Sequence, residues 1–505
     1  MKKISILIVI LFGLFQAKAQ SVNDALRYSQ DDLIGTARFR AMGGAFGALG
    51  GDLSSINVNP AGSAIFANSQ AGLTFSNSQT KNNANYFGTT RSTNVNDFNI
   101  NQAGGVFVFD ANSDWNKFTF ALNLDDNRSF KNNVSFAGTN PNNSIANYFL
   151  SYANGIPLNV LNDFRYNDLF YNEQQAYLGY NAFIIDPVIN SPNNTAYTSA
   201  VLPGRFNQEN ITTTAGNSGK ASFNFAAQYE DNLTVGINLN AHFSELRQTS
   251  SFFESNSNNT STTDNYVKRV RFNNDLYTVG SGFSFNLGAI YKATKELRVG
   301  LAFESPTWYN FTDEISQNIT ATSGTISTEL PPDVLVPLQG DKIILEPYTL
   351  QTPAKLTGSI AYVFGKRGLI SLDISTKDYS TAKFRPKNDF RNTNNAISQN
   401  LNSSTEIRLG GEYKIKKVSL RAGYRWEESP FIKNDVNNGI NGDLTAYSGG
   451  IGYNFGDTKI DLAFSHSKRF TNQSLFSQGF MDAPNVSTIN NTIAFTILFD
   501  FDSLF

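Results

Sequence analysis

The C-terminal stretch 492–505 reads TIAFTILFDFDSLF, and it decides the class of fold. Phe495, Ile497, Phe499 and the terminal Phe505 all share one parity within it. Alternation with a period of two is typical of a β-strand that has one apolar face. The stretch therefore predicts a final strand whose apolar face meets either a second sheet or lipid.

The same alternation recurs along most of the chain. Apolar residues at every second position mark the segments 118–124, 233–241, 297–303, 407–415, 418–426 and 460–464. In a soluble sandwich the apolar faces would pack on each other, whereas in a membrane barrel they would meet lipid and the polar faces would line the interior. Alternation alone does not separate these two folds, but the connections do.

The connections fall into two length classes, short and long, that alternate along the chain. Short turns are expected at 111–116, 230–232, 293–295, 365–367, 416–417 and 456–457. Long segments are expected at 78–103, 125–219, 247–279, 306–353, 380–404, 427–446 and 467–491. This pattern predicts an all-β transmembrane antiparallel β-barrel of about fourteen strands, with short turns on one side and long extracellular loops on the other.

The largest expected loop is 125–219 and the next is 306–353. Within the largest loop, residues 130–138 have the composition of a further strand, which would require a partner inside that loop.

The N-terminus has the features of a secretory signal peptide. Lys2 and Lys3 precede the apolar run 4–15, and Ala17-Lys18-Ala19 supplies a cleavage site. The run is shorter than the ~20 residues that a membrane-spanning helix needs. We therefore expect a signal peptide at 1–19, a non-alternating segment at 20–69 and the barrel at 70–505.

Composition excludes several classes of function. The 40 basic residues nearly balance the 42 acidic residues, which gives no electrostatic basis for nucleic-acid binding. The chain has no cysteine and only two histidines, so no metal site and no cofactor are predicted. The 42 phenylalanines favour surfaces that face something other than water.

The segment 20–69 differs from the rest of the chain. It begins with a possible helix at 23–34, continues with the glycine-rich run 41–51, and ends with Asn59-Pro60-Ala61-Gly62. A flexible periplasmic tail is one interpretation, although such tails are usually more charged. The other is a compact segment inside the barrel, since glycines allow close backbone approach and positive φ.

The glycine-rich stretch 35–51, Asp52 and the Asn59-Pro60-Ala61-Gly62 motif resemble the outer-membrane long-chain fatty-acid transporter family, FadL with its aromatic-hydrocarbon-transporting relatives such as TodX. Residues 285–288, leading through Gly300 to Ser305-Pro306, and the terminal aromatic residue add to the resemblance. Membership would imply a fourteen-stranded barrel in the outer membrane of a Gram-negative bacterium, plugged by an N-terminal hatch. It would also imply hydrophobic ligands that leave sideways through a gap in the wall.

The chain departs from the family in one respect, because its longest loop follows the third strand. Only the hatch motif, Asn59, Pro60, Ala61 and Gly62, is therefore carried over from the resemblance.

Candidate ligand-binding residues lie in the apolar part of the largest loop. Phe149, Leu158, Leu161 and Phe164 are the candidates, and the last three have the spacing of a short amphipathic helix. One interpretation is a groove that collects an apolar ligand from outside. The other is a cap in which this loop packs on the apolar residues of 306–353.

Two further sets of polar residues are expected to face the lumen. Charges at lumen parity favour ion-pair ladders, with a ligand carboxylate site as the alternative; they are Arg298, Glu304, Arg408, Glu412, Arg421, Arg425 and Asp461. His242 has the same parity and, with His466, Met42 and Met481, is the basis for considering a haem ligand. Nothing in the spacing indicates a catalytic set, so no enzyme is predicted.

These observations predict an outer-membrane channel for passive uptake of hydrophobic small molecules, with long-chain fatty acids as the first choice. A haemin receptor and a secretion-accessory barrel that binds protein cargo are the alternatives. The expected partners are the hydrophobic ligand and the outer-membrane lipids, and the expected state is a monomer.

Overall fold

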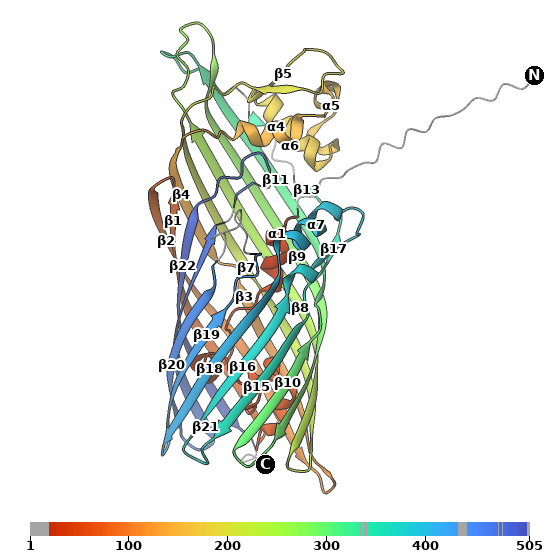
Figure 1. The fold of residues 1–505 in the computed structure, drawn as a ribbon, viewed down its shortest axis with the longest axis vertical. Coiled ribbons are helices and arrows are strands. Elements are labelled where there is room, and N and C mark those ends of the chain that lie inside the picture. The colour runs from red at the N-terminus through yellow and green to blue at the C-terminus, as the bar shows by residue number, and fades with distance from the viewer. Residues whose placement is uncertain are drawn as a thin grey trace, which may run out of the picture.

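The computed structural model describes residues 20–333, 335–337, 342–432, 442–472, 474–476 and 478–501, which form a tall β-barrel with helices inside it and above it (Figure 1). The predicted signal peptide and the terminal Phe505 lie outside the described residues.

Fourteen strands close the barrel. They are β1 (Gln70–Tyr86), β2 (Thr89–Asp110), β3 (Trp115–Ser129), β7 (Phe206–Tyr229), β8 (Leu233–Ser255), β9 (Tyr266–Lys292), β10 (Leu297–Glu304), β15 (Lys355–Val363), β16 (Gly368–Asp378), β18 (Ser403–Ile415), β19 (Val418–Glu427), β20 (Leu444–Asn454), β21 (Thr458–Asn472) and β22 (Asn485–Asp500). Each pairs antiparallel with the next, and β22 pairs with β1. Closure leaves no free sheet edge around the lower barrel.

Shorter strands extend this wall upward. β4 (Asn132–Asn140) continues the third strand above β3, and β11 (Trp308–Gly324) continues the seventh above β10. β14 (Tyr348–Gln351) and β17 (Lys383–Arg385) do the same above β15 and β16, while β12 (Leu335–Val336) and β13 (Ile343–Ile344) pair with β11. β5 (Ile185–Pro187) and β6 (Tyr197–Ser199) form a separate hairpin.

The outer face of the lower barrel is an apolar belt. Leu239, Leu301, Leu409 and Leu462 are exposed on it, whereas their neighbours of opposite parity, such as Arg408, are buried in the lumen. Apolar side chains outside and polar side chains inside are typical of a barrel that stands in lipid. The predicted fold class is therefore confirmed.

The expected loop boundaries were wrong in a consistent way. Residues 78–103 are not a loop, because β1 and β2 continue to a tight turn at Phe87 and Gly88. Likewise β7 begins at Phe206, inside the expected loop 125–219, and β11 lies inside the expected loop 306–353. In the upper parts of these strands, such as 78–86 of β1, polar residues occupy both faces, so the apolar alternation stops while the strand continues.

Residues 130–138 are not an additional barrel strand. They lie largely in β4, which pairs with the upper part of β7 and so needs no partner inside the loop. The connection that follows, 141–205, carries α4 (Ala146–Ala153), α5 (Leu158–Asp163), η2 (Tyr166–Asp168) and α6 (Tyr171–Asn181). The helix expected from the spacing of Leu158, Leu161 and Phe164 is α5.

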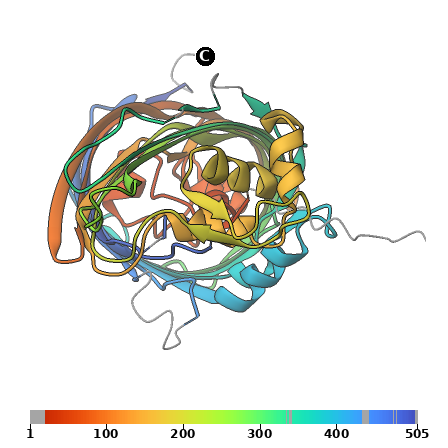
Figure 2. The ribbon, with the colours of Figure 1, turned by 90° about the horizontal axis from the view of Figure 1, so that it is seen from above.

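The remaining helices lie within the barrel and beside its upper rim. α1 (Val22–Ser29), α2 (Ala37–Ala41), α3 (Ser55–Val58) and η1 (Pro60–Ile65) belong to the N-terminal segment, and the view from above shows this segment within the ring of strands, under α4–α6 (Figure 2). η3 (Tyr379–Thr381) and α7 (Arg391–Asn400) follow β16. Among the described residues, no helix has the length and hydropathy to cross a membrane.

The belt generates a first prediction. Leu301 is 59% exposed at the middle of the apolar stretch of β10. Leu301→Arg is expected to cost about 2–4 kcal/mol of folding free energy in a bilayer, because the cation must leave water. Leu301→Met, which keeps the surface apolar, is the matched control. Urea titration in liposomes, followed by gel mobility of the folded barrel, measures both; equal stability of the two variants would contradict a lipid-facing belt.

Candidate functional site

The hatch, residues 20–69, is tied to the inner wall through Asn59. Asn59 Nδ2 donates to the carbonyl oxygen of Gly47 over 2.7 Å and to that of Ala289 in β9 over 3.1 Å. Gly51 N donates to the carbonyl oxygen of Gly62 over 3.0 Å. The Asn59-Pro60-Ala61-Gly62 motif therefore joins the glycine-rich run of the hatch to itself and to the wall.

Glycines of the wall receive the hatch. A Cβ atom on Gly236 of β8 would lie 2.5 Å from the carbonyl carbon of Pro60, and one on Gly288 of β9 would lie 2.7 Å from Pro60 Cδ. On β19, a Cβ atom on Gly423 would collide with the backbone of the hatch at Gly43. Real Cβ atoms are not accommodated at such distances, so these wall positions require glycine for close backbone approach.

Ion pairs hold the other side of the hatch. Arg38 Nε of α2 lies 2.9 Å from Glu412 Oε2, which also pairs with Arg421 Nε over 2.6 Å. Arg421 Nη1 continues to Asp461 Oδ1 over 2.5 Å. A second ladder joins Arg408 and Arg425 through Glu406. The prediction of ion-pair ladders is thus confirmed for these residues.

Two of the predicted lumen charges have other surroundings. Arg298 Nη1 donates to the carbonyl oxygen of Leu49 in the hatch over 3.0 Å, and Glu304 lines two small cavities. Inside the hatch, Asp52 accepts from Thr36 Oγ1 over 2.8 Å and from Ser54 N over 2.9 Å. Burial raises the pKa of the Asp52 carboxyl above its ordinary value, and the positive charge of Arg38 opposes that rise.

The wall glycines that contact the hatch generate a second prediction. Gly423→Val is expected to dislodge the hatch from β19 and to raise leakage of small hydrophilic solutes, because the added methyl groups overlap the backbone at Gly43. The matched control is Gly358→Val on β15, since a Cβ atom there meets no atom within 4 Å. Single-channel conductance in planar bilayers measures the leak. The same low conductance in both variants would show that the hatch does not depend on close approach at Gly423.

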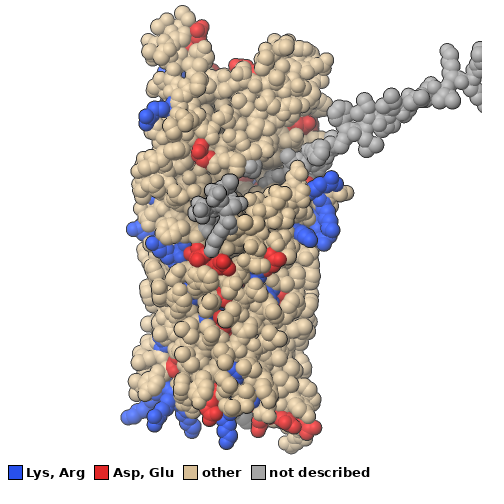
Figure 3. Space-filling model, viewed as in Figure 1, with Lys and Arg blue, Asp and Glu red and all other residues tan. Residues whose placement is uncertain are grey.

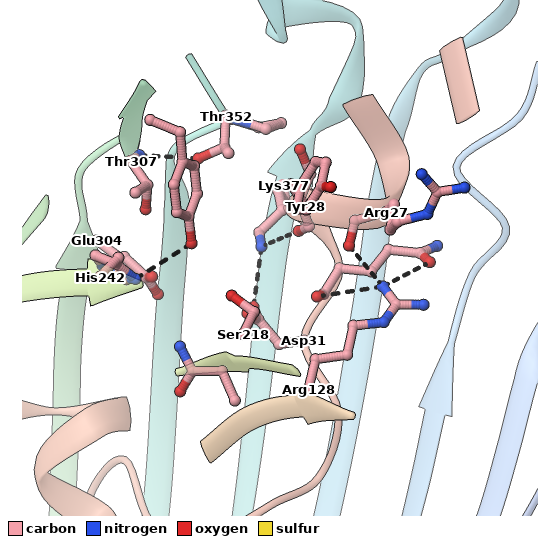
Figure 4. A pocket seen from close by; sticks show the side chains of 15 residues that line it. Arg27, Tyr28, Asp31, Arg128, Ser218, His242, Glu304, Thr307, Thr352 and Lys377 are labelled. Carbon is pink, nitrogen blue, oxygen red and sulfur yellow. Dashed lines mark hydrogen bonds and ion pairs between the residues drawn. The ribbon is translucent and has the colours of Figure 1, made fainter. Parts of the chain in front are cut away.

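The first helix of the hatch is held at its C-terminal end by two wall cations. Arg128 Nη1 of β3 donates to the carbonyl oxygen of Arg27 over 3.0 Å, and Lys377 Nζ of β16 donates to that of Ser29 over 2.8 Å. Lys377 also pairs with Asp31 over 3.0 Å. Figure 4 shows both cations reaching the chain where α1 ends. Cations are favourable there because the final carbonyl groups of a helix carry partial negative charge.

Apolar side chains surround α1, and we call this region the α1 chamber. Its buried members include Leu26, Tyr28, Phe130, Leu246, Tyr309, Phe311, Tyr348, Leu350, Phe384, Phe390 and Ile397. They come from the hatch, from the junction of β3 and β4, from β8, β11, β14 and β17 of the wall, and from α7 with its N-cap residue Phe390. The α1 chamber is thus an apolar level between the upper mouth and the polar lumen below, and α1 occupies it.

Small polar cavities lie below the α1 chamber. The larger has a volume of ≈ 90 Å³ and is lined by hatch residues together with Asp125, Asp126, Lys220, Glu304, Lys355 and Arg408. Lys220 is only 6% exposed, and it forms no hydrogen bond or ion pair with a described residue. Its cross-strand neighbour Asp125 accepts from Gln102 Nε2 instead. A nearly buried cation therefore faces this cavity without a hydrogen bond or ion pair to a described residue, and its cross-strand neighbour is the acidic Asp125.

The hydrogen-bond ladder of the wall is broken beside this cavity. β2 pairs with β3 from Asp110 only as far as Gln102, which lies opposite Asp125. Above that point, β4 pairs with β7 alone, so backbone hydrogen bonds no longer join the second and third strands. Among the described residues, the contacts that cross involve side chains: Asp97 of β2 accepts from Ser129 Oγ over 2.7 Å and pairs with Lys131, and Thr93 Oγ1 donates to the carbonyl oxygen of Asn133 in β4.

The hatch contacts this break directly. Arg40 Nη2 donates to Asn101 Oδ1 of β2 over 3.0 Å, and the guanidinium group is almost wholly buried. On the outer face of β2, Phe98 and Ile100 are exposed next to the break. The break therefore lies between a hatch residue inside and apolar side chains that face lipid outside.

A helical cap covers the upper mouth. Phe149, Leu158 and Leu161 are buried in its core, which also includes Phe272 of β9, Val336 and Phe476. Phe164 is instead 52% exposed, and Phe170, Phe183, Val188 and Ile189 are exposed with it on the same connection. Of the four predicted ligand-binding residues, the structure brings three together in the cap core and leaves Phe164 at its surface.

His242 and His466 do not come together. His242 faces the lumen, as its parity predicts, with Nε2 2.8 Å from Ser284 Oγ and Nδ1 3.3 Å from the Tyr309 hydroxyl. His466 Nδ1 lies 2.8 Å from Asn491 Oδ1 on the paired strands β21 and β22. Each imidazole is thus engaged by polar side chains of the wall.

Sequence reasoning missed the residues that connect wall and hatch. Wall glycines at lumen parity, such as Gly236 and Gly288, were a visible signal, because glycine in a strand interior marks close approach of another backbone. Lys220 and Arg128 carried no comparable signal. Their roles depend on which strands are neighbours in the wall and on where the hatch lies in the lumen.

The cap generates a third prediction. Phe149→Ala is expected to cost the cap about 3–5 kcal/mol, since it leaves a cavity in a packed core. Phe164→Ala should leave the cap intact and weaken its binding of a fluorescent long-chain fatty acid. Hydrogen exchange of α4 and α6 measures the first effect, and fluorescence titration the second. Equal protection of these helices in both variants would contradict the placement of Phe149 in the core.

Comparisons with known proteins agree with this architecture. The model of the family described as outer membrane protein transport protein (OMPP1/FadL/TodX) matches residues 214–483. A FadL homologue of Pseudomonas aeruginosa superposes with a TM-score of 0.54 at 12% sequence identity, over 93% of this chain and 98% of that chain. The Pseudomonas putida toluene transporter TodX gives a TM-score of 0.47 at 16% identity, over 92% and 98% of the two chains. No curated protein sequence matches the chain.

Proposed function

The chain belongs to the outer membrane protein transport protein family (OMPP1/FadL/TodX), and we propose that within this family it takes up long-chain fatty acids or similar anionic amphiphiles. It is an outer-membrane β-barrel of the Gram-negative type and a channel for hydrophobic compounds, in a family of transport channels rather than enzymes. The proposal concerns the class of ligand and the route by which it passes through the barrel.

The α1 chamber is the observation that carries the proposal. It is an apolar, aromatic-lined level inside a lumen that is otherwise polar, and it lies beneath a cap with exposed phenylalanines. An apolar chain that entered there would exchange water for aromatic surface, which is favourable by roughly 25 cal/mol per Å² of apolar area, and this gain would offset the contacts that Leu26 and Tyr28 of α1 give up. Exposed Phe164, Phe170 and Phe183 would supply the first contact from outside.

Lys220 supports an anionic head group. Five carboxylates also line its cavity: Asp31 pairs with Lys377, Asp125 accepts from Gln102, Asp126 accepts from Asn217, and Asp32 and Glu304 form no ion pair with a described residue. Arg408 and Lys355, which share the cavity, both pair with Glu406. Lys220 is then the cation of this cavity that is available for a ligand carboxylate. A neutral hydrocarbon would leave it unpaired.

The break between β2 and β4 supports a lateral exit. It adjoins the cavity at Asp125 and Asp126, no backbone–backbone hydrogen bond between described residues joins β2 to β4 there, and it has Phe98 and Ile100 on its outer side. Separation of the two strands at this height would break a few side-chain contacts and no backbone ladder. A ligand would then pass from the cavity into the bilayer without crossing the lower hatch.

The fourth prediction tests this route. The chain has no cysteine, so Asp97→Cys with Ser129→Cys places one disulfide across the break, where the native side chains are in contact. Oxidation is expected to abolish uptake of a labelled fatty acid, and reduction to restore it. The control is Asn83→Cys with Ser92→Cys, a cross-strand pair within the β1–β2 hairpin. Undiminished uptake by the oxidised first pair would refute exit at this position.

The fifth prediction concerns the ligand. Lys220→Met should weaken binding of a long-chain fatty acid roughly tenfold or more, because hydrogen bonds to charged groups contribute about 1.5–3 kcal/mol. Binding of the uncharged alcohol of the same chain length should not change. Lys81→Met, at an exposed position on β1, is the matched control. If Lys220→Met weakens the alcohol and the acid equally, the residue supports the fold and not the head group.

A further inference from the structure

An exposed basic patch lies on the outer side of the wall beside α7. It consists of Lys383 and Arg385 of β17, Lys387 of the following turn, and Arg391 of α7, and we call it the α7 basic patch. All four side chains are exposed. Arg385 donates to Gln351 Oε1 over 3.5 Å, and none of the four cations forms an ion pair with a described residue. Asp389 is the one acidic residue in the stretch 383–400.

The α7 basic patch begins where the apolar belt ends. On β16 the outward residues Ile370 and Ile374 are exposed and apolar, and the next outward residue is Thr376. After the turn at 379–382, the outward positions are Lys383 and Arg385. Figure 3 shows Lys and Arg gathered at the lower rim and again at the right-hand side at mid-height, with fewer charged side chains between these two groups.

An exposed tryptophan lies in the same row of the sheet as the α7 basic patch. Trp308 of β11 lies opposite Gln351, which lies opposite Lys383, so the three share one row across the sheet. Trp308 is exposed on the outer face. Tryptophan is enriched at the boundary between hydrocarbon and head groups. The cations therefore stand at the level of the lipid head groups of the upper leaflet.

Stability of the fold does not account for these charges. Arg391 lies in the first turn of α7, where the helix dipole disfavours a cation, and the first turn has no acidic residue. The four neighbouring positive charges also repel each other, and Asp389 supplies one negative charge among them. An anion supplied from outside the chain would remove this repulsion, and phosphate suits both arginine, which binds it through two N–H groups, and lysine, which acts as a point charge.

We propose that the α7 basic patch binds the phosphate groups of a phosphorylated glycolipid in the outer leaflet of the outer membrane. The position of the patch at the edge of the belt selects a membrane lipid as the source of the phosphate. The segment it would hold also covers the hatch: Phe390 and Ile397 pack in the α1 chamber, and Thr393 Oγ1 donates to the carbonyl oxygen of Gln20 over 3.4 Å. Bound lipid would thus stabilise the side of the chamber that α7 forms.

The test measures the glycolipid retained by the barrel after extraction from outer membranes without refolding. Lys383→Gln, Arg385→Gln, Lys387→Gln and Arg391→Gln are combined in one variant, and mass spectrometry counts phosphorylated glycolipid per barrel. The matched control makes the same four changes at the opposite rim, at Lys366, Arg367, Lys416 and Lys417, which are equally exposed. Heat-modifiable gel mobility confirms that both variants fold.

The α7 variant is expected to retain roughly tenfold less glycolipid or lower still, because several charges near the surface are removed together, while the control stays at the wild-type level. Wild-type protein should also lose retention when the purified glycolipid is dephosphorylated. Unchanged retention in the α7 variant, equal loss in the two variants, or equal retention of dephosphorylated lipid by the wild type would overturn the proposal.

Discussion

Backbone N–H and C=O groups at membrane depth must all find partners, and the rest of this structure depends on how the barrel meets that requirement. Pairing of β22 with β1 closes the sheet, and the ladder runs around the wall through fourteen strands. Between β2 and the third strand of the wall, the ladder stops beside the hatch, above the pair Gln102 and Asp125. Above that pair side chains make the contacts: Asp97 accepts from Ser129 Oγ, and Arg40 of the hatch donates to Asn101 Oδ1.

The lumen follows from the same alternation that makes the belt. Positions that point away from lipid must be either polar and paired or small enough to admit another backbone. Both solutions occur: Glu412 and Arg421 form a ladder that Arg38 of the hatch joins, whereas Gly236 and Gly288 let Pro60 approach the wall. The lower part of the hatch is therefore held partly by backbone proximity and charge, whereas α1 is held by apolar packing in the α1 chamber.

Much of the fold could be predicted from the sequence, and the reasons are physical. Phe495, Ile497 and Phe499 alternate because one face of β22 meets lipid, so membrane strands are visible in the chain. The upper strands are not, because residues such as 78–86 have polar groups on both faces. The sequence indicates a separate strand at 130–138, because the alternation does not show that β4 continues the wall above β3.

The site was less predictable. The Asn59-Pro60 motif was visible as a resemblance, but its partners Gly236 and Gly288 lie on strands far away in the sequence. Phe149 and Phe164 look alike in an apolar loop, and only the packing of α4 against its neighbours buries one and exposes the other. Lys220 became a candidate when Asp125, its neighbour across the strands, proved to bond to Gln102.

The central claim is that an apolar ligand leaves through the wall and not through the lower hatch. Uptake of a labelled long-chain fatty acid by proteoliposomes, with and without albumin enclosed as an aqueous acceptor, tests it most directly. A co-loaded hydrophilic dye reports leakage in the same sample. The account predicts that label enters the bilayer at the same rate with or without enclosed albumin, while the dye stays inside. Uptake that requires enclosed albumin and releases the dye in parallel would contradict it.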